Sequence, residues 1–96
     1  MPDWTFITKH GAVLSLIDRR SKITAREIAA ELGITERSVH RIIKDLEKAD
    51  YIKKRKKGRT NSYKVNGKKS LRRKHLRQTP VGDLLKLLDG KEPPTS

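Results

Sequence analysis

The sequence predicts a mainly α-helical domain that carries a small β-hairpin and an additional C-terminal helix, an α+β fold. Apolar residues recur at helical spacing in three successive segments between residues 8 and 49. The spacing changes to alternation between residues 51 and 65, and a last apolar stripe falls between 80 and 90. With 96 residues and 33% apolar content, the chain can build one small core but not two domains.

The first three predicted helices span residues 9–20, 25–32 and 36–49. A threonine precedes each of them as the expected N-cap: Thr8, Thr24 and Thr35. The run "TARE" forms a capping box, since Glu27 stands three residues after its threonine. Gly33 ends the second helix at a position where a positive φ is expected.

Alternation then predicts a two-stranded hairpin. The segments "YIKKRKK" and "NSYKV" flank the turn "GRT", and Ile52, Tyr63 and Val65 are the candidates for its core side. Further along, "TPVGDLLKLLDG" shows a threonine cap, Pro80 at the first helical position and Gly90 as a stop. The expected organisation is an arm (1–7), a compact domain (8–66), a basic linker (67–79), an amphipathic helix (80–90) and a flexible tail (91–96).

The last helix has an apolar stripe formed by Val81, Leu84, Leu85 and Leu88. Two arrangements satisfy it. The helix either folds back onto the domain core, or pairs with its mate in a second chain to form a homodimer. Leu87 widens the apolar arc, so the helix can touch more than one surface.

The positive charge of the chain is confined to one segment. Of the formal net charge of +13, all arises between Lys53 and Arg77, which contains thirteen Lys and Arg residues and no acid. The rest of the chain has eleven basic and eleven acidic residues. Such a concentration favours a polyanionic partner. A solvated or disordered tail is the alternative, but tyrosine, valine and glycine interrupt the run in a strand-like pattern.

Several function classes fit the sequence poorly. There is no glycine-rich phosphate loop, nucleophile–base set or apolar carboxylate pair, so we do not expect an enzyme. The chain has no cysteine, and His10, His40 and His75 lack metal-ligand spacing, so neither metal nor other cofactor is expected. No stretch resembles a signal peptide or membrane span, which favours a cytoplasmic protein without a membrane partner.

The predicted helix 36–49 separates its side chains into two faces. At about 100° per residue, an apolar sector holds Val39, Ile42, Ile43 and Leu46. Almost opposite, one basic stripe holds Arg37, Arg41, Lys44 and Lys48, while the acids lie on the flanks. A solvated helix usually interleaves charges of both signs on its outer face. Segregated donors instead suit a helix that enters the major groove of DNA, although an ordinary basic outer face is the alternative.

Two consecutive segments of the chain resemble parts of a known protein family. The segment "TAREIAAELGITERSVHRIIKDL" resembles the helix-turn-helix of bacterial and archaeal transcription regulators, with Ala29 where the helices cross and Gly33 in the turn. Val39 and Ile42 match its apolar positions on the second helix. The following "LEKADYIKKRKKGRTNSYKV" resembles the end of a recognition helix and a β-hairpin wing. The order is similar to that of MarR/ArsR-type winged helix-turn-helix regulators: helix, short strand, helix, helix, strand, wing, strand.

The resemblance implies roles by position. On the recognition helix, the residues nearest the bases would be Thr35, Arg37, Ser38 and Arg41. His40, Lys44 and Lys48 would meet phosphates, although His40 is as readily a surface histidine without a role. On the wing, Arg59 would enter a minor groove, Lys54, Lys56 and Lys57 would line phosphates, and Asn61 would bond to backbone or base. The basic linker would either lie along DNA or stay mobile and attract DNA at long range.

These features together predict a sequence-specific regulator that binds double-stranded DNA, with helix 36–49 in the major groove and wing 51–65 on the backbone and minor groove. The cellular site would be the nucleoid of a prokaryotic cytoplasm. The alternatives are an architectural or non-specific binder of DNA or RNA, and a winged-helix protein-interaction module with an acidic partner. The chain departs from its MarR and ArsR counterparts because it lacks long dimer helices and a metal-ligand set.

Overall fold

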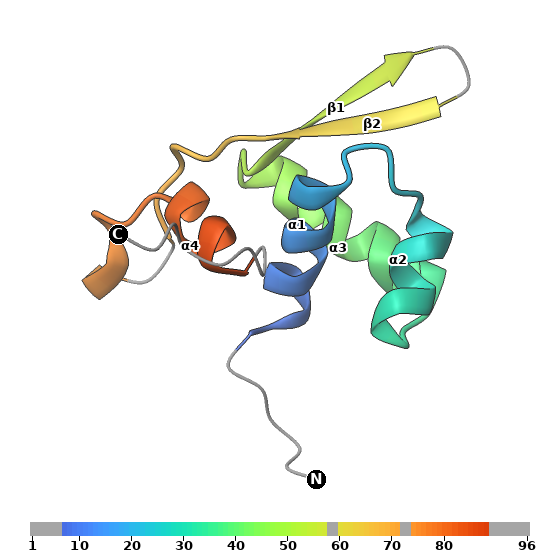
Figure 1. Cartoon of the computed structure of the whole chain (residues 1–96), viewed down its shortest axis with the longest axis horizontal. Helices are drawn as coiled ribbons and strands as arrows, with labels where there is room; N and C mark the ends of the chain where they lie inside the picture. Colours follow the sequence, from blue (N-terminus) through green and yellow to red (C-terminus); the bar gives the residue numbers. More distant parts are fainter. Residues whose placement is uncertain (1–6, 58–59, 72–73, 89–96) are drawn as a thin grey trace, which may run out of the picture.

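The structure, a computed structural model, describes residues 7–57, 60–71 and 74–88, with residues 56, 57, 60, 61 and 74 described by their backbone alone. The elements in chain order are α1 (Lys9–Arg19), α2 (Ala25–Leu32), α3 (Glu36–Lys48), β1 (Ile52–Lys57), β2 (Thr60–Val65), the 3-10 turn η1 (Lys74–Leu76) and α4 (Val81–Leu88). Figure 1 shows the three N-terminal helices packed together, the hairpin projecting from them and α4 beside α1. The predicted α+β class and element order are confirmed.

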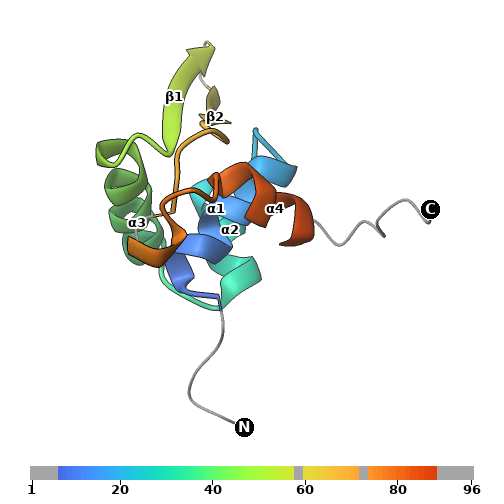
Figure 2. The same ribbon diagram turned by 90° about the vertical axis from the view of Figure 1, so that its left-hand side faces the viewer.

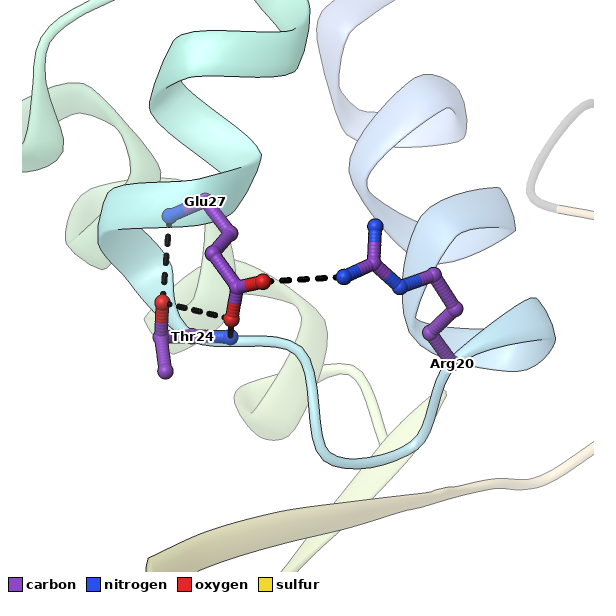
Figure 3. Close-up of polar contacts among 3 residues, drawn as sticks. All are labelled: Arg20, Thr24 and Glu27. Atoms are coloured by element: carbon purple, nitrogen blue, oxygen red, sulfur yellow. Dashed lines mark hydrogen bonds and ion pairs between the residues drawn. The ribbon is translucent and has the colours of Figure 1, made fainter.

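The predicted caps form as expected. The Thr8 side chain accepts a hydrogen bond from the Gly11 amide, and Thr24 accepts one from the Glu27 amide at 3.1 Å. Glu27 returns the bond by accepting from the Thr24 amide at 3.0 Å, which completes the capping box seen in Figure 3. Gly33 ends α2 with φ of +66°, the left-handed conformation that glycine adopts without steric cost.

One core joins all four helices to the base of the hairpin. The apolar face predicted for α3 is fully buried: Val39, Ile42, Ile43 and Leu46. On α1, Val13, Leu14 and Ile17 are buried, and Leu16 is partly buried against the core. Ala29 of α2 is buried where that helix meets α3. The core therefore fixes which face of α3 remains outside.

The hairpin is antiparallel and runs in register from Ile52 opposite Val65 to Lys57 opposite Thr60. As expected, Ile52 is buried and Tyr63 packs against the core. The short strand expected between α1 and α2 does not form. Residues 21 and 22 make a turn that buries Ile23, leaving a single cross-link in which the Ser21 carbonyl accepts from the Tyr63 amide at 3.2 Å.

The chain leaves α3 through a left-handed residue that the sequence did not reveal. Asp50 has φ of +64°, and its amide donates to the Glu47 carbonyl while the Tyr51 amide donates to the Leu46 carbonyl. This pair of bonds is a Schellman motif, which satisfies the last carbonyls of the helix. The motif turns Tyr51 into the core, where its hydroxyl donates to the Ser70 carbonyl at 2.7 Å.

Residues 67–71 fold back onto the start of α4. Backbone hydrogen bonds run from the Val81 amide to the Lys69 carbonyl at 2.7 Å and from the Gly82 amide to the Gly67 carbonyl at 2.8 Å. A β-bridge pairs Ser70 with Pro80, flanked by the Val81 bond and by a bond from the Leu71 amide to the Thr79 carbonyl at 3.0 Å. Helix α4 begins at Val81, one residue later than expected, because Pro80 belongs to this bridge.

Of the two arrangements predicted for the last helix, the structure has the intramolecular one. Val81 and Leu85 are each 3% exposed within the core cluster, and α4 packs on α1. Both residues therefore belong to the core of the single chain, and dimerisation through this helix stays a prediction. Leu84 and Leu88 are half-buried, and Leu87 is the large apolar residue left outside, at 81% exposure among the residues described.

Candidate nucleic-acid interface

Helix α3 forms one side of the molecule. Figure 2 shows α3 and α4 on opposite sides, with α1 between them. Because the apolar residues of α3 are buried against α1 and α2, its other face points away from the protein. That outer face carries the predicted basic stripe, and its four members are all exposed: Arg37, Arg41, Lys44 and Lys48. His40 is exposed on the same helix.

Two of the three acidic residues of α3, Asp45 and Glu47, lie near side chains of neighbouring elements, while Glu36 is exposed in the first turn. Asp45 accepts from His10 of α1, with Nε2 and Oδ2 2.8 Å apart. Glu47 lies close enough to Tyr63 of β2 that its charge adds to burial, the larger cause, in raising the pKa of the phenol. Both carboxylates therefore sit at the edges of the helix, and the field over the outer face is set by the basic stripe.

The N-terminal end of α3 combines a cap with a candidate contact. Thr35 accepts from the Ser38 amide and donates to the Ser38 hydroxyl, both at 3.0 Å. Its hydroxyl proton is therefore engaged within the helix end, while Ser38 keeps its own proton for another acceptor. The main role of Thr35 is therefore that of the N-cap, which sets the direction of α3. Arg37 and Arg41 follow one turn apart, so both point from the same side of the helix.

The hairpin presents further cations. Lys54, a predicted wing contact, is exposed and lies opposite Tyr63. Lys56 pairs in register with Asn61, and Lys57 with Thr60, whereas Arg59 lies outside the described residues. Three exposed cations of the hairpin were missed: Lys53, Arg55 and Lys64. The charge run contained them, but alternation alone did not show that both faces of the hairpin remain open to solvent.

The part of the chain that the structure describes contains no helix able to cross a membrane. Nor do those residues bring three or more His, Asp or Glu side chains together in a way that would hold a metal ion. Among the three histidines, His10 pairs with Asp45, and this contact joins α1 to α3.

Comparison with known proteins identifies the domain. Residues 8–53 match the family model of winged helix-turn-helix DNA-binding domains. Residues 8–53 thus form a winged helix-turn-helix DNA-binding domain. No match was found among curated proteins or among solved structures. The matched region ends at Lys53, so most of the hairpin and all of the segment up to α4 lie beyond it.

Proposed function

We propose that the protein is a transcriptional regulator that recognises a particular sequence of double-stranded DNA. Helix α3 lies in the major groove, and the hairpin lies along the neighbouring backbone and minor groove. The single observation that carries this proposal is the exposed stripe of Arg37, Arg41, Lys44 and Lys48, opposite a buried apolar face. The order of helices and hairpin also fits kinship with MarR/ArsR-type regulators, and the proposed setting is a prokaryotic cytoplasm.

The stripe has two chemically distinct halves. Arg37 and Arg41 stand in the N-terminal half of α3, and a guanidinium can donate two parallel bonds to the O6 and N7 atoms of guanine. Lys44 and Lys48 follow in the C-terminal half, where an ammonium group suits a phosphate oxygen. Base choice therefore falls to the arginines and Ser38, while the lysines fix the position of the helix.

The hairpin supplies contacts that carry less sequence information. Its exposed cations, Lys53, Lys54, Arg55 and Lys64, extend the positive surface beyond α3. Contacts to phosphate add affinity that falls with salt but do not distinguish base pairs. The wing thus strengthens binding, and Arg59 at the turn adds preference for a narrow minor groove.

A second function, non-specific binding of nucleic acid, is favoured by the concentration of thirteen cations between Lys53 and Arg77. Backbone charge would then supply nearly all of the affinity. The two functions differ in what the arginines do, because a non-specific binder loses affinity for all sequences equally when Arg37 or Arg41 is removed.

Selection from a random duplex pool at about 150 mM salt, where the Debye length is near 8 Å, separates them. The regulator is expected to enrich a motif, and an inverted repeat would indicate a symmetric dimer. Retention of duplex without enrichment would support the non-specific function instead. Retention of nothing would direct the search to RNA or an acidic protein. The variant Lys86→Ala, which removes an exposed cation from α4, is the control for charge alone.

A further inference from the structure

A hollow of about 830 Å³ lies beside the C-terminal end of α3. One wall is the end of α3 with the residues that follow it, and the opposite wall is formed by residues 69–71 with Arg77. Its cationic side chains come from both walls: Lys48 from α3, and Lys69 and Arg77 from the C-terminal segment. The winged-helix match ends at Lys53, so the outer wall is an addition to the domain shared with the family.

Two hydrogen bonds to backbone carbonyls hold this outer wall in place. The hydroxyl of Tyr51, which lies two residues after the C-cap of α3, donates to the Ser70 carbonyl at 2.7 Å. On the other side, the Lys69 carbonyl accepts from the Val81 amide. Because the backbone of Lys69 is fixed from α4 and its side chain is exposed, the ammonium group is presented at the hollow by a rigid segment.

The hollow continues the basic stripe of α3. Lys48 is both the last residue of the stripe and part of the lining, so the stripe and the hollow share one cation. The hollow therefore lies next to the basic stripe that the proposed DNA contact uses, because Lys48 belongs to both.

Two carboxylates also line the hollow, and they bear on which ligand fits. Asp45 is bonded to His10, whereas Asp50 is exposed at the left-handed residue after α3. A small anion enclosed there would approach both carboxylates. A duplex lying across the mouth would instead place one phosphate among the lysines while its neighbours extend to either side. The mixture of cations and carboxylates therefore suits a duplex lying across the mouth of the hollow better than a small anion bound inside it.

We propose that this hollow is a third DNA-contacting surface, which holds the sugar–phosphate backbone next to the groove occupied by α3. The inference rests on the proposed function, because it requires that α3 face the duplex. It names what the C-terminal segment adds: phosphate contacts by Lys69 and Arg77 that lengthen the footprint without reading bases. Asp50 opposes these contacts and limits their strength.

The test is the salt dependence of binding to a duplex of about 30 base pairs for Lys69→Gln, Arg77→Gln and the control Lys86→Gln. Each lost phosphate contact lowers the slope of log affinity against log salt by about 0.9, so the fall between 50 and 200 mM becomes about 3.5-fold smaller. Lys69→Gln and Arg77→Gln should each show this loss, with base preference unchanged. Lys86→Gln, on the far side, should match the wild type.

A variant that is expected to bind DNA more tightly separates the loss of a contact from misfolding. Asp50→Asn removes the opposing charge and keeps a residue type that tolerates the left-handed conformation, so it should bind DNA several-fold more tightly at 50 mM salt. Wild-type slopes for Lys69→Gln and Arg77→Gln, with no gain for Asp50→Asn, would overturn the inference. Calorimetric binding of inorganic pyrophosphate that Lys69→Gln abolishes, with DNA affinity unchanged, would overturn it in favour of a small-anion site.

The inference and the proposed function fail separately. If Lys69→Gln changes the salt slope but Arg37→Ala and Arg41→Ala weaken all sequences equally, the third contact stands and the regulator does not. If the arginine variants change base preference while Lys69→Gln behaves like Lys86→Gln, the regulator stands and the third contact is wrong.

Discussion

Replacing Gly82 with alanine tests whether α4 is held against residues 67–71 by direct contact between two backbones. A Cβ added at Gly82 would lie 3.0 Å from the Gly67 carbonyl oxygen and 3.1 Å from its Cα. Both atoms belong to the backbone, so relief requires that the chain move. Overpacking of this kind costs about 1–3 kcal/mol, whereas alanine in a helix gains up to about 1 kcal/mol over glycine.

The net expectation for Gly82→Ala is therefore a loss of up to about 2 kcal/mol. For a domain of this size, each kcal/mol lowers Tm by roughly 4–8 °C. The matched control is Gly11→Ala in α1, where the added Cβ would meet the Ile7 side chain at 3.1 Å, and a side chain can rotate away. Gly11→Ala should be neutral or more stable in the same thermal melt followed by circular dichroism. Equal stabilisation by both substitutions would refute the close approach of Gly67 and Gly82.

Three further predictions concern stability. Asp50→Gly should raise the free energy of unfolding by about 0.5 kcal/mol in urea titrations, because relief of the left-handed strain exceeds the added entropy of the unfolded chain; a loss of stability would contradict this. Tyr51→Phe should lower it by about 1 kcal/mol, since the bond to the Ser70 carbonyl is removed; no change would show that this bond is dispensable. Hydrogen bonds from Thr24, together with Arg20, hold the pKa of Glu27 below its ordinary value of 4.5. The ionised carboxylate therefore contributes stability that is present above about pH 4.5. This contribution is lost as the pH falls from about 4.5 through the lowered pKa of Glu27 in the folded protein. Over that pH range, the difference in free energy of unfolding between wild type and Glu27→Gln should narrow and not widen.

The sequence was most informative where a local rule determines the geometry. Three threonine caps and a left-handed glycine were predicted from residue type and position, and all four formed as expected. The apolar face of α3 also followed from periodicity, because a helix with one such face must turn it inward. With that face fixed, the exposure of the basic stripe at Arg37, Arg41, Lys44 and Lys48 was determined as well.

The sequence was less informative where distant segments meet. Asp50 carries no residue-type signal for a positive φ as strong as that of Gly33, so the turn that buries Tyr51 was missed. The approach of Gly67 to Gly82 joins segments that no periodicity relates. The hollow beside Lys48 depends on that approach, and it could not be found before the chain was folded. The short strand expected between α1 and α2 was wrong: a turn stands there, and Ile23 is buried.

Selection with the Arg41→Ala variant beside the wild type would show whether α3 reads the bases of DNA. Both proteins would be presented with the same random duplex pool at about 150 mM salt. The wild type should enrich a motif, and the variant should lose preference at one or two of its positions, equivalent to about 1–3 kcal/mol of discrimination. If the variant instead enriched the same motif and only bound it more weakly, Arg41 would contact phosphate alone and α3 would not read bases through it.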